Sequence, residues 1–548
     1  MNRVMQVSIW FSWPAWSWVN TAWLLLAEVL ANKWYTVYAD KEYASVIKGE
    51  NNCFFLYISN KEEIFITKKI DYFLAYDPYA IEKNTSLYDL QNTFMFKDEK
   101  CTYKNTFAFG SAIRIFGIPL EEGKEVLKKQ FAQKNLTEEK MQQNYEDLEH
   151  WYEYVLQCGW SACKIINFDT PIGEKKLIKY GNELIAQWAI ASGLEFYAAY
   201  PMTPASSIID EIIKDKNVIF YQGEDEIAVS MAMLWAKYAW KRAMCWTSGG
   251  WFALMTESIA FSNQAEIWGV YILSQRDGPS TWTPTFTGQS DLNYALNASF
   301  WETKPIVFAP STFQEAYNFV WKALNWSDTY QHPVIMLVDK QLSESYLSID
   351  PKTLIPEPPK RGEKTQAEEN DTYKRYEITE NWISPYAIPW EENTTFIASS
   401  YEHDEYWFTN EEPSMKKAMV EKRMRKLETF VEKEFNESFY GYEIINPNAK
   451  KFYVTMGINR YPIQEYLKWK EELWLIIIKS FYPFDKRLKK FLEENKQTIQ
   501  QLIFVEMNYT WILEDLLRKE CELYQDRNSK ITNKRKYNLY PIFQEDLI

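Results

Sequence analysis

The chain has 548 residues, enough for about three to four domains at roughly 150 residues each. Hydrophobic residues make up 46% and charged residues 25% of it, which is typical of a globular protein and excludes a disordered or collagen-like chain. Its formal charge of −14 argues against a nucleic-acid binder that depends on broad neutralisation of phosphates.

Few residues are available for metal or disulfide chemistry. The three histidines, His150, His332 and His403, are too few for most zinc hydrolase sites, and we expect His403 at a surface or interface. No two of the six cysteines have C-x-x-C spacing, so the chain lacks a ferredoxin-like cluster motif. Scattered thiols fit a reducing compartment better than a disulfide framework, and we expect a cytoplasmic protein.

The first 33 residues are open to two interpretations. No charged residue lies between Arg3 and Glu28, which could indicate a signal anchor or a membrane helix. Serine, proline, asparagine and threonine interrupt this span, however, and a strand over 4–11, a tight loop and a helix over 19–33 explain it as well. A second β-rich run follows at 35–38. We favour the second interpretation and expect no membrane association.

Three segments alternate β-rich runs with helical patterns, so the predicted fold class is α/β with three domains. The first, 1–172, also has a strand at 53–58 and a charged helical stretch at 120–156. The second, 173–350, has helices at 182–192 and 226–238 between strands at 196–200, 243–247, 270–274, 306–309 and 334–338. Strands separated by helices predict a parallel sheet.

The last third of the chain begins with a predicted linker and helical arm at 351–445. Four prolines lie between 351 and 359, a charged run covers 360–370, and 415–434 is expected to form one long charged helix. The third α/β domain, 446–548, has strands at 452–455, 473–478 and 502–506.

Four polar loops in the second domain carry candidate chemistry, because ligands bind beyond the carboxyl ends of parallel strands. They are Tyr-Pro-Met-Thr-Pro at 200–204, Glu-Asp-Glu at 224–226, Thr-Ser-Gly-Gly at 247–250, and the segment 275–285 with Arg276. A buried arginine in such a loop is a bidentate carboxylate receptor. Taken singly, each loop also has a plainer explanation: a turn, a helix cap favoured by the dipole, or a surface arginine.

In this order and spacing the blocks resemble the α subunit of the 2-oxoacid:ferredoxin oxidoreductases, in the form with a γ-like domain fused at the N-terminus. The 2-oxoglutarate branch is the most similar, and the segments 383–389, 402–406 and 504–510 match as well. The resemblance implies a γ-like domain at 1–172, a pyrimidine-binding domain for thiamine diphosphate at 173–350, and a transketolase-C-terminal-like domain at 446–548.

The family resemblance also implies a reaction and partners. The reaction is oxidative decarboxylation of a 2-oxoacid to an acyl-CoA, with coenzyme A as co-substrate and one-electron transfer to ferredoxin. Since the chain has neither a Gly-Asp-Gly motif nor paired cysteines, we expect Mg²⁺ and the [4Fe–4S] cluster on a β subunit, in an (αβ)₂ assembly. Alternatives are a member specific for pyruvate or another 2-oxoacid, or a non-catalytic pseudo-subunit.

The site residues are carried over from the same resemblance. Glu226, with Glu224 as the second choice, is expected to contact the ring nitrogen of the aminopyrimidine, which favours the tautomer that removes the C2 proton. Further cofactor contacts are expected from Gly249 and Gly250. The expected contacts with the 2-oxoacid are Thr203, Arg276 and Thr285.

Glycine and tryptophan counts are abnormal. The chain has 17 Gly, where the usual ~7% would give about 38, and 24 Trp. Tryptophan stands where the family has glycine in the turn at 10–18 and at Trp235, Trp240, Trp251, Trp282, Trp301, Trp382, Trp390, Trp407 and Trp511. Our hypothesis is that the gene reads UGA as glycine and was translated with UGA as tryptophan, since an indole would overpack such turns. The alternative is a truly tryptophan-rich pseudo-subunit; Trp151, Trp321, Trp326 and Trp469 are left open.

Overall fold

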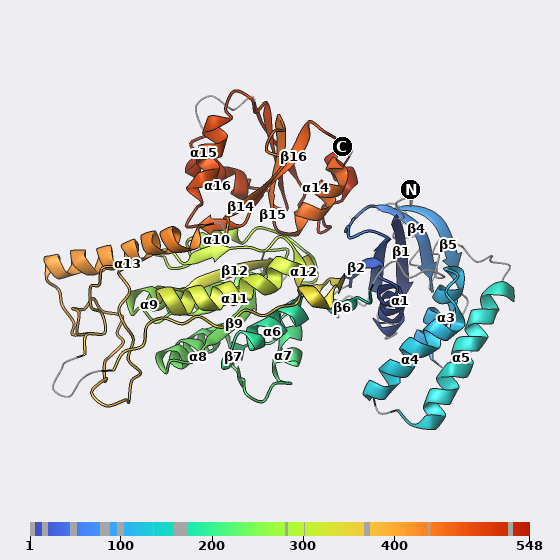
Figure 1. Ribbon diagram of the computed structural model, residues 1–548, viewed down its shortest axis with the longest axis horizontal. Helices are drawn as coiled ribbons and strands as arrows, with labels where there is room; N and C mark the ends of the chain where they lie inside the picture. The colour runs from blue at the N-terminus through green and yellow to red at the C-terminus, as the bar shows by residue number, and fades with distance from the viewer. Residues whose placement is uncertain are drawn as a thin grey trace.

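The protein contains three β-sheets flanked by helices, as the computed structural model in Figure 1 shows. The structure describes residues 6–13, 20–43, 52–76, 88–95, 103–134, 136–157, 174–279, 283–300, 302–366, 373–436, 439–468, 470–523 and 530–548. The predicted α/β fold class is confirmed.

The first sheet has seven strands in the order β5-β4-β1-β3-β2-β13-β6. Its N-terminal strands are β1 (Gln6–Trp13), β2 (Thr36–Glu42), β3 (Asn52–Ser59), β4 (Lys69–Ala75) and β5 (Asp89–Met95). Helix α1 (Asn20–Asn32) is buried along its apolar side chains, with Leu26, Val29 and Leu30 at 0% exposure. The strand and helix predicted in the first 33 residues are therefore both present. No helix in the described ranges is long and apolar enough to cross a membrane.

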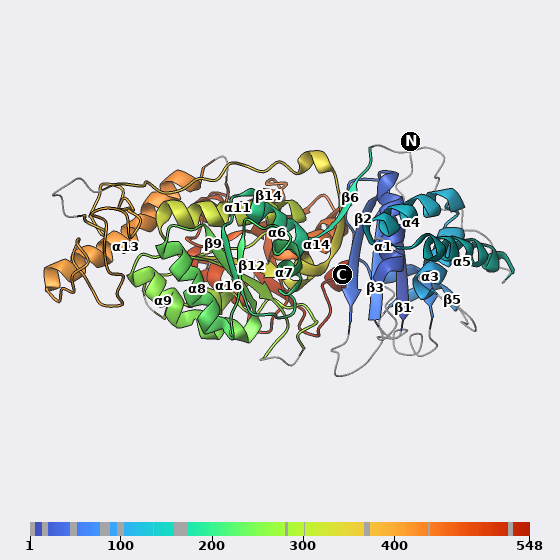
Figure 2. The same cartoon turned by 90° about the horizontal axis from the view of Figure 1, so that it is seen from below.

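Two strands from the middle of the chain complete the first sheet. β6 (Leu177–Tyr180) and β13 (Tyr346–Ile349) pair with each other, and β13 also pairs with β2. Both strands lie within 173–350, the range predicted for the second domain, so the chain crosses twice between the first two sheets. Figure 2 shows β6 in this bridging position, while α3 (Lys104–Ile115), α4 (Leu120–Lys134) and α5 (Glu138–Gln157) lie at the far end.

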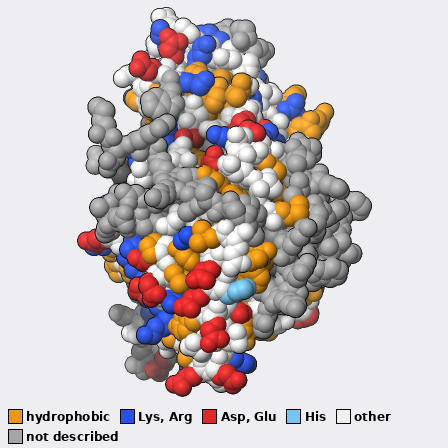
Figure 3. Space-filling view, turned by 90° about the vertical axis from the view of Figure 1, so that its right-hand side faces the viewer, with side chains coloured by type: hydrophobic (Ala, Val, Ile, Leu, Met, Phe, Trp, Pro, Cys, Tyr) orange, Lys and Arg blue, Asp and Glu red, His pale blue; other side chains and the backbone are white. Residues whose placement is uncertain are grey.

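The charged helical stretch predicted at 120–156 contains two helices, α4 and α5. Together with α3 they cover one side of the first sheet (Figure 1). Figure 3 looks at this end of the molecule, where acidic and basic side chains are intermixed among apolar ones. Among the described residues on this face, neither sign of charge forms a large separate region.

The second sheet has the order β17-β11-β12-β10-β9-β7-β8. All its strands except β17 (Ser480–Tyr482) run parallel, as predicted. Successive residues of β10 alternate between two cores, with Ile272 in one and Tyr271 and Leu273 in the other, because side chains in a strand point to opposite faces. The parallel strands are β7 (Phe196–Ala199), β8 (Ile219–Gln222), β9 (Ala243–Ser248), β10 (Val270–Gln275), β11 (Ile306–Phe308) and β12 (Val334–Asp339).

Helices enclose both faces of this parallel sheet. α6 (Gly181–Ala191) packs on α11 (Phe313–Tyr330) at one face, and α8 (Glu226–Tyr238) lies over β7 and β9 at the other. The remaining short helices are α7 (Ser207–Ile212), η1 (Gly249–Met255), α9 (Thr256–Gln264), α10 (Leu292–Leu296), α12 (Lys340–Glu344) and η2 (Pro351–Thr353).

A long helix and a third sheet follow. α13 (Pro413–Glu434), predicted at 415–434, extends beyond the rest of the molecule in Figure 1. The third sheet has the order β14-β16-β15-β18-β19. Its elements are β14 (Tyr442–Ile445), β15 (Lys451–Met456), η3 (Gly457–Asn459), α14 (Arg460–Leu467), β16 (Leu473–Ile478), α15 (Lys486–Glu494), β18 (Gln501–Glu506), α16 (Ile512–Glu520), β19 (Ile531–Arg535) and η5 (Gln544–Leu547).

Six tryptophans have positive φ angles, which L-residues with bulky side chains rarely adopt. Trp34 (φ 71°) and Trp240 (φ 62°) follow α1 and α8 directly. At each, the next amide donates to a carbonyl five residues back, Tyr35 N to Leu30 O and Lys241 N to Ala236 O, as in a glycine-terminated helix. The other four are Trp382 (φ 65°), Trp390 (φ 76°), Trp407 (φ 107°) and Trp511 (φ 54°).

Candidate functional site

The four polar loops meet at one edge of the second sheet. Thr203 follows β7, Glu226 opens the helix after β8, and Ser248 and Arg276 end or follow β9 and β10. The three strands β7, β9 and β10 are adjacent and parallel, with Ser248 paired to Ser274 across the ladder. Their carboxyl ends therefore lie together, at the kind of edge where open α/β sheets bind ligands.

Glu226 is a buried carboxyl group at the start of α8. Asp225 caps this helix by accepting a 2.8 Å hydrogen bond from the Ala228 amide, so Glu226 is free of the capping role. The side chain is 1% exposed, and neither carboxylate oxygen has a hydrogen-bond partner among the described residues. Burial raises the pKa of Glu226 and the charge of Asp225 adds to the rise, while the backbone N–H of Glu226 itself and the charge of Arg276 oppose it. Glu224, the second choice, is exposed to solvent.

Arg276 is a buried cation, and one edge of its guanidinium has no hydrogen-bond partner among the described residues. Its side chain is 3% exposed, and its Nη1 donates a 2.5 Å hydrogen bond to the carbonyl oxygen of Thr203. Nε and Nη2 have no partner within the described part of the chain. These two nitrogens donate side by side from one edge of the guanidinium, which is the geometry that matches a carboxylate.

Gly249 lies against this guanidinium. A Cβ atom at Gly249 would be 3.1 Å from Arg276 Nε, and the backbone φ is +53°, so both the space and the backbone favour glycine. Gly250, which we expected beside it in cofactor binding, is exposed. Of the two predicted glycines, Gly249 is the one in contact with a candidate site residue.

Buried polar atoms of residues that were not predicted as site residues also lack hydrogen-bond partners at this edge, among the described residues. Native proteins pair the great majority of buried polar atoms, so several unpaired ones together indicate a ligand site. No local pattern marks these residues as site residues, because threonine, glutamine and aspartate at the ends of strands and in loops are usually exposed. The additional unpartnered atoms are Thr247 Oγ1, Gln275 Oε1, Thr287 Oγ1 and Asp291 Oδ2.

The first sheet also reaches this region. The Tyr43 hydroxyl, just after β2, donates to both oxygens of Glu344 at 3.0 and 2.9 Å, and Tyr43 acts electrostatically on Arg276. Glu344 is also paired with Lys340 at 3.1 Å. The predicted substrate residue Thr285 is buried and lies in a narrow gap beside Asp40, Thr287 and Lys340. The N-terminal residues thus form one wall of the candidate site.

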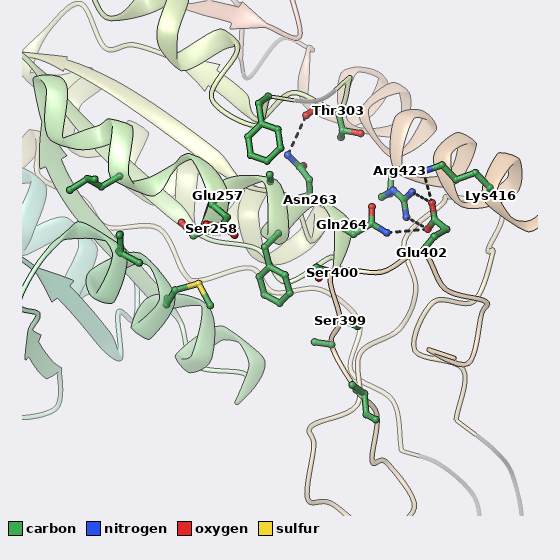
Figure 4. Close-up of a pocket in the computed structure, with 18 residues that line it drawn as sticks. Glu257, Ser258, Asn263, Gln264, Thr303, Ser399, Ser400, Glu402, Lys416 and Arg423 are labelled. Carbon is green, nitrogen blue, oxygen red and sulfur yellow. Dashed lines mark hydrogen bonds and ion pairs between the residues drawn. The ribbon is translucent and has the colours of Figure 1, made fainter. Parts of the chain in front are cut away.

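A separate cavity lies away from this sheet edge. It measures about 880 Å³, lies between α8, α9 and the segment 397–423, and does not include Glu226 or Arg276 among its lining residues. Figure 4 shows Glu402 in this cavity, where it accepts hydrogen bonds from Arg423, Lys416 and Gln264. Because these groups are already satisfied, this cavity offers less chemistry than the sheet edge.

The structure corrects one expectation, and two predicted positions lie outside the residues that it describes. His403, expected at a surface or interface, is 1% exposed in this chain and stacks on Tyr376 with ring centroids 3.6 Å apart. Trp282 and Trp301, two predicted glycine positions near the site, lie outside the described residues. Among the residues that are described, no three His, Cys, Asp or Glu side chains are placed to hold a metal ion.

Comparison with known proteins identifies relatives. The pyruvate flavodoxin/ferredoxin oxidoreductase, thiamine diphosphate-binding family model matches residues 187–423. The 2-oxoacid:ferredoxin oxidoreductase 2 subunit alpha of Aeropyrum pernix is 31% identical over 448 residues, which cover 77% of this chain and 68% of that protein. The corresponding subunit of oxidoreductase 1 from Sulfurisphaera tokodaii is 28% identical, covering 90% and 89%.

A solved structure matches the whole fold. The 2-oxoglutarate:ferredoxin oxidoreductase from Magnetococcus marinus, determined with 2-oxoglutarate, coenzyme A and succinyl-CoA bound, superposes with a TM-score of 0.86 at 25% identity. The match covers 100% of this chain and 98% of that one.

Proposed function

Because the chain belongs to the 2-oxoacid:ferredoxin oxidoreductases, as an alpha subunit, we propose that it takes part in the oxidation of 2-oxoglutarate to an acyl-CoA with ferredoxin as electron acceptor. The choice of 2-oxoglutarate is supported by the Magnetococcus marinus enzyme, which matches over the whole chain and is named for that substrate.

One observation carries the proposal: a carboxyl group and a guanidinium, both buried, present open hydrogen-bonding atoms at the same sheet edge. Glu226 offers two unpartnered oxygens, and Arg276 offers two unpartnered nitrogens. A buried polar group without a hydrogen-bond partner costs about 1–3 kcal/mol of stability, and a charged group costs more. A bound ligand that supplies the missing hydrogen bonds would remove this cost. A cofactor that needs a carboxyl partner and a substrate that is a carboxylate meet these two needs together.

The thiamine diphosphate that the family implies fits Glu226. Its aminopyrimidine ring nitrogen requires a carboxyl partner, and Glu226 is a buried carboxyl whose two oxygens have no side-chain hydrogen-bond partner among the described residues. When bound, the cofactor supplies the electron-accepting chemistry by which a 2-oxoacid loses carbon dioxide. Glu226 would hold a proton at the ring nitrogen, and its raised pKa suits it to share that proton. Burial keeps water from competing for the contact.

Arg276 and its neighbours would orient the 2-oxoacid. The open Nε–Nη2 edge of Arg276 would bind the carboxylate of the substrate, while Nη1 stays on the Thr203 carbonyl. This bond fixes the Pro-Met-Thr-Pro loop against β10, so the Thr203 hydroxyl would be held close to the substrate. Thr285 would contribute from the side of the N-terminal residues.

We propose that the remaining cofactor sites of the enzyme lie on a partner subunit. We place the Mg²⁺–diphosphate site and the [4Fe–4S] cluster on a β subunit in an (αβ)₂ assembly, since this sequence has no Gly-Asp-Gly motif and no C-x-x-C pair. Coenzyme A would accept the acyl group. The γ-like, pyrimidine-binding and transketolase-C-terminal-like domains at 1–172, 173–350 and 446–548 remain our proposed division of the chain.

The test is turnover of the reconstituted complex. Co-expressed with its β partner, the chain should support CoA-dependent reduction of ferredoxin or viologen by 2-oxoglutarate, and faster than by pyruvate. Glu226→Gln should lower kcat by about 10²- to 10⁴-fold, the usual contribution of a positioned acid–base group. Glu224→Gln is the matched control because Glu224 is exposed two residues away, and its turnover should equal the parent's.

Two outcomes would contradict the proposal. No turnover of any 2-oxoacid by an intact, cofactor-loaded complex would favour the pseudo-subunit alternative. Full turnover by the Glu226→Gln complex would remove Glu226 from the mechanism while leaving the family assignment intact.

A further inference from the structure

Asn182 is a buried polar residue that contacts the loop carrying Thr203, and none of the roles above uses it. It is the second residue of helix α6 and is 0% exposed. Its Nδ2 atom donates one hydrogen bond of 2.8 Å to the carbonyl oxygen of Pro204 and another of 2.8 Å to Ser207 Oγ. The side chain therefore joins the start of α6 to the loop between β7 and α7.

Two consecutive carbonyl groups of this loop are held by side chains from different elements. Arg276, which follows β10, donates to the carbonyl of Thr203, and Asn182, on α6, donates to the carbonyl of Pro204. The backbone on the carboxyl side of Thr203 is thus fixed at two successive peptide groups. The Thr203 side chain itself is partly exposed, so its hydroxyl stays accessible to a ligand.

The start of α6 is in turn fixed by close backbone contacts. The Gly181 amide donates to the Ser345 carbonyl at 3.2 Å, and a Cβ atom on Gly181 would be only 1.9 Å from the Leu342 carbonyl oxygen, an approach that glycine allows. Leu342 and Ser345 lie shortly after β12, the parallel neighbour of β10. Asn182 and Arg276 are therefore both attached at the ends of adjacent strands.

The bonding of Asn182 suits a positioning role better than a purely stabilising one. Its Oδ1 atom is buried and has no hydrogen-bond partner among the described residues. An unpaired buried acceptor lowers stability, so a residue that served stability alone would gain nothing from it. Asparagine does supply a donor to a carbonyl that can only accept, and no apolar or ionised acidic side chain of the same size provides one.

We propose that Asn182 is a positioning residue for the 2-oxoacid, which acts through the Thr203 loop. Asn182 holds the Pro204 carbonyl while Arg276 holds the Thr203 carbonyl, and together they keep the Thr203 hydroxyl where the substrate contact needs it. Without the Asn182 donor the Pro204 carbonyl is released, whereas the bond from Arg276 remains. This inference rests on the proposed function, because it takes Thr203 as a contact of the substrate.

The test is a double-mutant cycle on the holoenzyme. Thr203→Val removes the hydroxyl and Asn182→Leu removes the donor, each at nearly constant volume. We expect Asn182→Leu to lower kcat/KM for 2-oxoglutarate about tenfold in the parent, with a larger change in KM than in kcat. In the Thr203→Val background the same change should cost less than about twofold, because residues that act through one another are not additive.

Hydrogen exchange gives a readout that does not depend on turnover. Amides in the segment 200–207 should exchange faster in Asn182→Leu than in the parent, because the loop has lost the bond to its Pro204 carbonyl. In Thr203→Val, where both carbonyl contacts remain, exchange over this segment should match the parent.

Two further variants control these measurements. Gln187→Met makes a similar amide-to-apolar change on the same helix, where Gln187 donates to Glu183 at 3.1 Å, and should follow the parent throughout. Asn182→Asp keeps the size of the side chain but can donate to Pro204 only when the new carboxyl is protonated. Its deficit should therefore shrink as the pH falls, while that of Asn182→Leu stays constant. This comparison keeps the inference testable even if Asn182→Leu folds poorly.

Several results would overturn the inference. Equal losses from Asn182→Leu in the parent and Thr203→Val backgrounds, or a loss confined to kcat, would show that Asn182 is only structural. Unchanged hydrogen exchange over 200–207 would contradict its hold on the loop. If Thr203→Val itself matches the parent, Thr203 is not a substrate contact and the inference is wrong. A parent complex that turns over no 2-oxoacid would instead overturn the proposed function.

Discussion

The six tryptophans with positive φ carry a large energetic cost. A left-handed conformation costs an L-residue about 1–2 kcal/mol, so six of them cost about 6–12 kcal/mol. This is comparable to the entire stability of a typical domain, about 5–15 kcal/mol. Glycine adopts the same conformation without that cost. Trp240, Trp382, Trp390, Trp407 and Trp511 were all predicted glycine positions from the sequence, and Trp34 is an addition from the backbone.

Peptide mass spectrometry on the protein from its native host tests this interpretation directly. We expect glycine at 34, 240, 382, 390, 407 and 511, because glycine adopts the positive φ of these positions at the lowest energetic cost. Trp326 is the internal control: its indole nitrogen donates to Glu434 at 2.8 Å and its ring packs on Phe430 and Phe439, so we expect tryptophan.

The opposite result would change the functional conclusion. Tryptophan at all six positions would mean that the strain is real and that the printed sequence is the protein's own. Trp251, beside Gly250 in the loop after β9, would then crowd the candidate site, and the pseudo-subunit alternative would gain support.

At the scale of elements, one buried carboxylate anchors the long helix α13. Glu266 accepts hydrogen bonds from Lys422 at 2.6 and 2.8 Å and from Lys426, and all three side chains are at most 1% exposed. Burial raises the pKa of Glu266, but Lys422, Lys426 and Arg375 lower it further, to well below its usual value. Arg423 and Lys416, which bind Glu402, and the buried Met419, Leu427 and Phe430 are its other attachments.

Glu266→Gln should therefore destabilise the attachment of α13. It leaves two lysines buried without a counter-charge, and breaking a buried ion pair from one side costs about 3–5 kcal/mol. The midpoint of chemical unfolding and hydrogen exchange over 413–434 would measure the effect. Glu421→Gln is the control, since Glu421 lies on the same helix, is partly exposed and pairs 4.0 Å from Lys417, so a change below about 1 kcal/mol is expected. Equal midpoints for the two variants would show that Glu266 is not the anchor.

At the scale of the whole molecule, the third sheet is joined to the second through the end of β12. Asp339 Oδ2 accepts a 2.6 Å hydrogen bond from the Ile458 amide, and Oδ1 accepts one of 3.0 Å from Gln289. Asn459 in turn donates to Gln289 at 2.8 Å. Gly457 makes this close approach possible, with φ +62° and a position where a Cβ would be 2.0 Å from Asp339 Oδ2.

Gly457→Ala should consequently weaken the junction. Backbone strain of about 1–3 kcal/mol and the clash with Asp339 add together, and we expect a clear drop in the unfolding midpoint and earlier proteolysis between the second and third sheets. Gly278→Ala is the matched control, because a Cβ there meets nothing within 4 Å. Its free energy of unfolding should change by less than about 0.5 kcal/mol. A Gly457→Ala protein as stable as this control would contradict the role of the junction.

The sequence by itself determined the element types and the identity of the loops that carry the chemistry. Helix α8 over Glu226–Tyr238 and the strands β9, β10 and β12 are strongly periodic or continuously apolar, so their type follows from local pattern. The family resemblance then pointed to Glu226, Thr203, Gly249 and Arg276, all of which lie at one sheet edge.

Only the tertiary structure decided which side chains lack partners and which segments share a sheet. The choice between Glu226 and Glu224 depends on burial, and the unpartnered nitrogens of Arg276 depend on contacts between residues far apart in sequence. β6 and β13 join the first sheet through backbone hydrogen bonds to each other and to β2. The local sequence pattern of a strand does not specify which strand it pairs with. Local periodicity fixes what an element is, whereas its neighbours are fixed by the packing of the whole chain.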